Sequence, residues 1–124
     1  MTHRRPDAGE MAAPLLEFDL AGELEQLRRE PEWSSGQNAK TLVKHDDLRV
    51  VLIALRAGAR IPDHRTDGRI SIHTVRGLVR VRAQDQVRDL PVGTLLALDQ
   101  ALAHDVEALE DSAILLTIAW PGPR

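Results

Sequence analysis

The 124-residue chain contains no cysteine and no tyrosine, and its aromatic residues are limited to Phe18, Trp33 and Trp120. The absence of cysteine excludes disulfides, thiolate metal sites and cysteine nucleophiles. So few aromatic rings offer no stacking platform for single-stranded nucleic acid. The formal net charge of -3 also gives no attraction to phosphate backbones. Nucleic acid is therefore not an expected partner.

Long hydrophobic runs are missing as well. No apolar stretch approaches the length that crosses a bilayer, and Pro6 and Asp7 stand where a signal peptide needs an apolar segment. We therefore expect a cytoplasmic protein with no membrane partner. The length and the 43% hydrophobic content predict one domain. Residues 1–14 mix Pro, Gly and charge without periodicity, which predicts a disordered N-terminal tail.

One amphipathic helix is expected near the N-terminus. Three leucines recur at the spacing of a single helical face: Leu20, Leu24 and Leu27. Asp19 is the candidate N-cap, and Pro31 ends the helix. Residues 15–39 should therefore form a helix and a loop that pack on the remaining chain. Trp33 should pin the end of the helix to that domain or to a second subunit.

The following segment, 40–120, consists of short apolar runs separated by turns. Alternating or doubly apolar runs predict β-strands over 40–44, 48–56, 70–75, 78–83, 87–90, 94–98, 104–108 and 113–120, with a further segment leading to His64. So many short strands, with little room for crossovers, predict an all-β antiparallel barrel or sandwich.

Glycines and histidines recur at matched spacings within these strands. In the first segment five residues separate a glycine, Gly58, from a histidine, His64, and Gly77 closes the segment. In the second segment Gly93 precedes His104. The pattern resembles the two motifs of the cupin family. The resemblance implies a jelly-roll barrel, or double-stranded β-helix, over 40–120, with one short N-terminal helix in front of it.

The departures from the cupin motifs concern the metal ligands. Metal-binding cupins usually supply two histidines and a glutamate from the first motif and one histidine from the second. This chain keeps His64 and His104, but Thr66 stands at the second histidine position and Ile70 at the glutamate position. Two imidazoles imply at most a weak site for a divalent ion such as Zn, Ni, Fe or Mn. Two carboxylates close to His64 in the sequence are candidates for a further ligand: Asp63 and Asp67.

Strand parity and the family register together predict a small-molecule pocket inside the barrel. Its expected lining is His64, Thr66, Ile70, Ile72, Val79, Val81, Leu96, His104 and Val106. His73 has the opposite parity and should point away from the pocket, as should Asp105 and Glu107. Four arginines form a candidate basic stripe on the outer wall: Arg76, Arg80, Arg82 and Arg88. Interspersed acids favour a solvated face there over a phosphate site.

Two functions stay open at this stage. In the first, the protein binds a small molecule, through a two-histidine metal site or without one, and the family resemblance admits isomerase or dioxygenase chemistry. In the second, it is a non-catalytic ligand sensor or dimeric scaffold with no metal. A homodimer is expected from the habit of the family. The fold cannot choose between these functions, because cupins host many.

Overall fold

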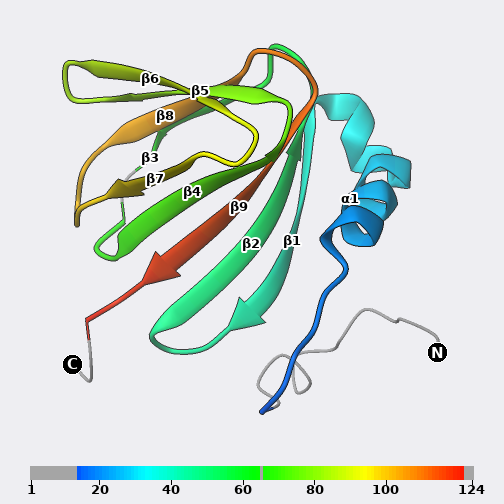
Figure 1. Ribbon diagram of the computed structural model, residues 1–124, viewed down its shortest axis with the longest axis horizontal. Helices are drawn as coiled ribbons and strands as arrows, with labels where there is room; N and C mark the ends of the chain where they lie inside the picture. Colours follow the sequence, from blue (N-terminus) through cyan, green and yellow to red (C-terminus); the bar gives the residue numbers. More distant parts are fainter. Residues whose placement is uncertain (1–13, 65, 122–124) are drawn as a thin grey trace.

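The computed structural model describes residues 14–64 and 66–121, with the backbone alone at Asp63 and His64. One α-helix and one 3₁₀ helix precede a series of β-strands (Figure 1). The elements, in order, are α1 (Leu20–Arg29), η2 (Pro31–Ser35), β1 (Gln37–Lys44), β2 (Leu48–Leu55), β3 (Arg60–His64), β4 (Arg69–Arg76), β5 (Leu78–Ala83), β6 (Gln86–Pro91), β7 (Leu95–Leu98), β8 (His104–Ala108) and β9 (Ser112–Ala119).

The strands form two antiparallel sheets that face each other, which confirms the predicted fold class. One sheet has the order β1-β2-β9-β4-β7, and the other has the order β3-β8-β5-β6. Most strand positions match the sequence-based expectation within a residue or two. The first strand begins at Gln37, inside the segment expected to be helix and loop. Within the described residues, β1 is an outer strand of the five-stranded sheet and β3 is an outer strand of the four-stranded sheet.

Alternating burial explains how the two sheets stack. In β4 the inward positions are buried and the outward ones are partly exposed, and β5 repeats this pattern. The inward residues of both sheets form one apolar cluster, and its buried members are Leu55, Ile70, Ile72, Val79, Val81, Leu90, Leu98, Val106, Ala108, Ile114 and Ile118. Burying aliphatic side chains between two sheets is the main force that holds such a sandwich together.

Helix α1 covers the outer face of the five-stranded sheet. Leu24 and Leu27 are its buried residues, and they pack with Leu42, Leu52, Ala54 and Ala113 in a second apolar cluster. Asp19 occupies the N-cap position, as predicted, but its side chain makes no capping hydrogen bond. The helix is therefore held by packing on the sheet more than by its own cap.

Polar contacts fix the two ends of α1 to the sheet. The buried ammonium of Lys40 on β1 lies 2.7 Å from a carboxylate oxygen of Glu23. At the other end, the ring of Trp33 lies between two guanidinium groups, 5.1 Å from Arg28 and 5.6 Å from Arg56. Trp33 thus joins the end of α1 to the end of β2. A contact of the helix end with the strand domain was one of the two roles expected for Trp33.

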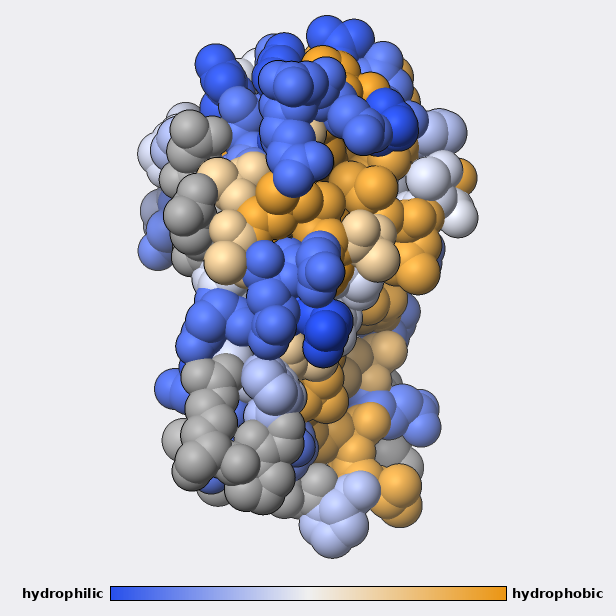
Figure 2. All heavy atoms as spheres, turned by 90° about the vertical axis from the view of Figure 1, so that its left-hand side faces the viewer, coloured by the Kyte–Doolittle hydropathy of each residue, from blue (hydrophilic) through white to orange (hydrophobic). Residues whose placement is uncertain are grey.

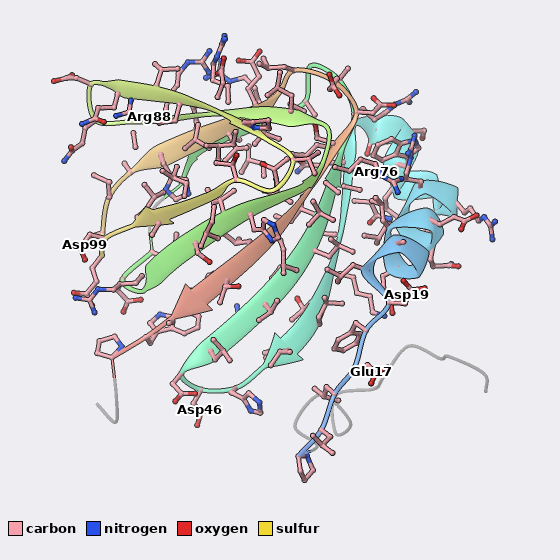
Figure 3. The ribbon with its side chains drawn as sticks, viewed as in Figure 1. Glu17, Asp19, Asp46, Arg76, Arg88 and Asp99 are labelled. Carbon is pink, nitrogen blue, oxygen red and sulfur yellow. The ribbon has the colours of Figure 1, made fainter. Side chains whose placement is uncertain are left out.

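The outer face of the four-stranded sheet is charged. Ion pairs connect its neighbouring strands: Arg60–Asp105, Arg82–Asp105, Arg82–Glu107 and Arg80–Asp89. Hydrogen bonding to Arg80 lowers the pKa of Asp89 and raises that of Arg80. Asp105 and Glu107 therefore face outward, as predicted. The expected basic stripe does not form, because acids neutralise Arg80 and Arg82, while Arg76 and Arg88 lie in separate parts of the fold (Figure 3).

The glycines of the two motifs serve the turns. Gly58, Gly77 and Gly93 all adopt positive φ angles, between 82° and 88°, where L side chains are strained. At Gly77 a side chain would also collide with the backbone of Asp111 and Ser112. The glycine pattern is therefore explained by backbone geometry alone.

The surface carries isolated apolar groups. The large exposed hydrophobic residues within the described chain are Leu15, Val87, Val92 and Leu95. On the side opposite α1, hydrophobic residues are interrupted by hydrophilic ones (Figure 2). None of the described helices is long and apolar enough to span a membrane.

Candidate ligand-binding cavity

A cavity of about 540 Å³ opens between the two sheets on the side of β1 and β3. Its lining residues come from one 3₁₀ helix and six strands: Glu32, Ser35, Gln37, Asn38, Ala39, Ile53, Ile61, Ile72, His104, Val106, Ile114 and Leu116. The volume is within the range of small-molecule sites. Its wall is mostly aliphatic, with His104 as the one ionisable side chain on the described strands that line it.

Burial distinguishes the mouth of the cavity from its base. Exposed or half-exposed polar residues of η2 and β1 form the mouth: Glu32, Ser35, Gln37 and Asn38. Buried residues of β4, β8 and β9 form the base: Ile72, His104, Val106 and Ile114. A ligand entering between β1 and β3 would therefore pass polar groups first and reach an apolar base that contains one imidazole.

The strand order explains why the sheets leave a space here. β1 is an edge strand of the five-stranded sheet, and its inner side borders the cavity. β3, the edge strand across the opening, is only five residues long, and its pairing with β8 is irregular between Ile61 and His64. The inner side of β1 consequently remains accessible at Ala39.

His104 is the first residue of β8 and is 5% exposed. Its Nδ1 lies 3.1 Å from the carbonyl oxygen of Leu102. A carbonyl can only accept, so Nδ1 carries the proton in the neutral ring and Nε2 carries the lone pair. The backbone of the preceding loop therefore selects one tautomer and orients the ring.

The backbone of His64 pairs directly with His104 in the β3–β8 ladder. The two strands thus bring together two positions that are far apart in the sequence, as the motif spacing predicted. The side chain of His64, like that of Asp63, lies outside the described residues.

Apart from Thr66, the remaining residues of the predicted pocket divide into two groups. Ile72 and Val106 line the cavity beside His104. Ile70, Val79 and Val81 are buried in the apolar cluster between the sheets, and Leu96 packs against that cluster from β7. These four fill the interior on the side of β4 and β5.

Thr66 is occupied within its own turn. Its hydroxyl accepts the backbone N–H of Gly68, and its carbonyl oxygen accepts that of Ala101. Asp67, the candidate carboxylate ligand, accepts a hydrogen bond of 2.7 Å from the indole of Trp120. Both polar groups therefore have structural partners.

The described side chains do not supply the metal ligands that the cupin fold implies. In the part of the chain whose side chains are described, no group of three or more His, Asp or Glu residues could hold a metal ion. Ile70, at the position of the usual glutamate, is 4% exposed and pairs with Leu98 and Ile118. A charged ligand there would be expensive to bury. His104 and His64 together offer two ligands, fewer than catalytic zinc sites use.

The sequence did not identify several of the residues that line the cavity. Ile53, Ile61, Ile114 and Leu116 line it, although the runs over 48–56 and 113–120 were recognised as apolar on both faces. Parity along a doubly apolar strand does not distinguish its inner from its outer face. In the structure Ile53 pairs with Ile114, and this pairing identifies the inner positions of both strands. The sequence alone does not reveal which strands pair.

No protein-family model and no curated protein matches the sequence. Solved structures share the architecture. A cupin superfamily protein from Desulfitobacterium hafniense superposes with a TM-score of 0.67 at 15% identity, over 68% of this chain and 78% of its own. An RmlC-like cupin protein from Desulfovibrio desulfuricans gives 0.64 at 20% identity, over 94% and 97%. A conserved protein of unknown function from Streptococcus pyogenes gives 0.74 at 21% identity, over 90% and 99%. This chain therefore has the cupin fold.

Proposed function

We propose that this cupin-fold chain binds a small, largely aliphatic molecule in the cavity between β1 and β3. The observation that carries the proposal is the combination of a 540 Å³ space, an aliphatic wall and one oriented imidazole. Sites for small molecules are typically concave and apolar, with a few polar groups that fix orientation.

His104 would provide the orienting contact. Nε2 of the neutral ring accepts a hydrogen bond, so a hydroxyl or N–H group of the ligand suits it. The same nitrogen could act as a general base, which is the route to an enzymatic role. Binding alone would make the chain a ligand sensor or scaffold.

A thermal-shift screen of small aliphatic alcohols, amines, ketones and acids tests this proposal. We expect hits that stabilise the wild-type chain but not Ala39→Phe, whose ring would occupy the space beside Ile53. Ala97→Phe is the matched control, because Ala97 is exposed on β7 and does not line the cavity. Hits that stabilise both variants equally would contradict the proposal.

Turnover distinguishes the enzyme from the sensor. Each hit should be incubated with wild-type protein and with His104→Asn, whose amide nitrogen can keep the hydrogen bond to Leu102 while Nε2 is lost. Product formation that disappears in His104→Asn would support catalysis. Unchanged compound after prolonged incubation would support a sensor or scaffold.

A second candidate is a weak divalent-metal site at His64 and His104. The direct pairing of these two strand positions favours it, since opposed residues in an antiparallel ladder are close neighbours. Bound Zn, Ni, Fe or Mn would act as a Lewis acid, and waters or ligand oxygens would complete its coordination.

Metal titration separates the two candidates. Isothermal titration of untagged protein with Zn²⁺ or Ni²⁺ should give a weak one-to-one site that is lost in His104→Asn and kept in His73→Asn. His73 pairs with Leu95 and Leu115 and does not line the cavity. Equal binding by both variants, or none by the wild type, would contradict the metal site.

We also retain the expectation of a homodimer. Val92 and Leu95, two exposed hydrophobic residues near β7, could contribute to such an interface. Light scattering after size exclusion should give twice the chain mass, and a monomer mass would contradict it.

A further inference from the structure

The charges at the mouth of the cavity bear on which ligands can enter. Glu32 carries the one charged side chain among the described lining residues, apart from the ionisable His104, and no Lys or Arg is among them. Glu32 is exposed on η2, and no described residue forms an ion pair with its carboxylate. The mouth is therefore acidic.

The neighbouring polar groups at the mouth are already engaged. The amide of Asn38 donates to the carbonyl oxygen of Leu27 and to the carboxylate of Glu30, and its oxygen accepts the N–H of Ala39. Ser35 donates to the carbonyl oxygen of Glu32. Among the hydrogen-bonding groups there, the carboxylate of Glu32 and the amide of Gln37 are the ones left to meet a ligand.

Two arginines near η2 have partners away from the cavity lining. The guanidinium of Arg56 lies 5.6 Å from the ring centre of Trp33. The guanidinium of Arg28 makes a cation–π contact with the same ring and forms an ion pair with Asp111. Both arginines are thus directed to the junction of α1 and the sheet, and neither lines the cavity.

We infer that the cavity selects ligands with an aliphatic body and a neutral or cationic end, such as an alkyl amine, and rejects carboxylates. This inference rests on the proposed ligand-binding function. An ammonium group beside Glu32 gains a favourable Coulomb interaction, whereas a carboxylate meets a like charge at the mouth or an aliphatic wall at the base.

A matched series of probes tests the inference: 1-hexylamine, 1-hexanol and hexanoate at neutral pH and low salt, titrated by ligand-detected NMR. We expect hexylamine to bind most tightly and hexanoate most weakly. In Glu32→Gln the advantage of the amine over the alcohol should fall about two- to fivefold, the range for an exposed charge pair. Raising the salt to about 0.5 M should reduce it as well. Asp85→Asn, a change in the β5–β6 turn on the far side of the fold (Figure 1), should leave it unchanged.

The outcomes separate this inference from the proposed function. If hexanoate binds as tightly as hexylamine and Ala39→Phe abolishes its binding, the cavity binds ligands and the inferred ligand class is wrong. An amine preference that survives Glu32→Gln would also overturn the role of Glu32. If none of the three probes binds, or if Ala39→Phe binds them all as the wild type does, the proposed function itself is contradicted.

Discussion

The space between the two sheets has a filled half and an open half. The filled half consists of inward residues on β4, β5, β6 and β7: Ile70, Val79, Val81, Leu90 and Leu98, each at most 7% exposed. The open half consists of inward residues on β1, β2, β3 and β9: Ala39, Ile53, Ile61 and Leu116. Both halves are aliphatic, so residue type does not distinguish them.

The position of the strands makes the difference. In the filled half, β5 and β6 cover the inner side of the five-stranded sheet, and their side chains interlock with those of β4. In the open half, β1 and β3 are edge strands, and both contribute residues to the cavity wall. The same apolar alternation therefore produces a core on one side and a candidate binding site on the other.

The largest effect on stability is expected in the filled half. Leu90 is 3% exposed and pairs with Val79. Leu90→Ala should lower the free energy of unfolding by about 2–5 kcal/mol, as truncations of buried leucine do. Ile61→Ala in the open half should cost clearly less, because Ile61 already borders empty space. Urea denaturation of both variants measures this, and equal losses would remove the distinction between the halves.

A smaller effect is expected at the junction beside the mouth. Trp33→Ala removes two cation–π contacts, to Arg28 and Arg56, and should cost about 1–2 kcal/mol. Because η2 also carries Glu32 at the mouth, the affinity for any cavity ligand should fall as well. Trp33→Phe should restore part of both quantities. Loss of stability with unchanged ligand affinity would show that η2 does not shape the open half.

The smallest effect is expected on the charged outer face, which belongs to neither half. The pKa of Asp89 is lowered in the folded protein, chiefly by its hydrogen bond to Arg80. At pH values above about 3.9, the pKa of Asp in an unfolded chain, the ionised carboxylate stabilises the fold. This contribution is lost as the pH falls through the lower pKa that Asp89 has in the folded protein.

The stability difference between the wild type and Asp89→Asn should therefore be small at neutral pH and vanish in acid. Thermal unfolding of the wild type and of Asp89→Asn at several pH values checks this. A difference that grows as the pH falls would contradict the assignment. Ligand affinity should be the same in the wild type and in Asp89→Asn, since Asp89 does not line the cavity.

The fold was largely predictable because its signals are local. Alternation in 78–83 and the leucines of α1 report burial residue by residue, and positive-φ positions explain the motif glycines at Gly58, Gly77 and Gly93. The motif spacing predicted that His64 and His104 share one cavity, and the β3–β8 ladder pairs their backbones.

The open half was not predictable in the same way. Ile53 and Leu116 belong to strands that are apolar on both faces, so their inward direction depends on which strand pairs with which. The mouth residues Glu32 and Gln37 look like ordinary loop residues in the sequence. Their placement depends on the Trp33 contacts that bring η2 to the end of β2, and such long-range contacts leave no periodic signal.

Chemical-shift mapping with a bound probe tests the central claim most directly. Methyl and amide resonances of isotope-labelled protein should be followed while 1-hexylamine, or the tightest hit of the screen, is added. We expect saturable shifts at Ile53, Ile61, Leu116 and His104, with Leu90 and Leu98 unaffected. Shifts confined to the filled half or to the outer faces, or none at saturating probe, would contradict a binding site in the open half.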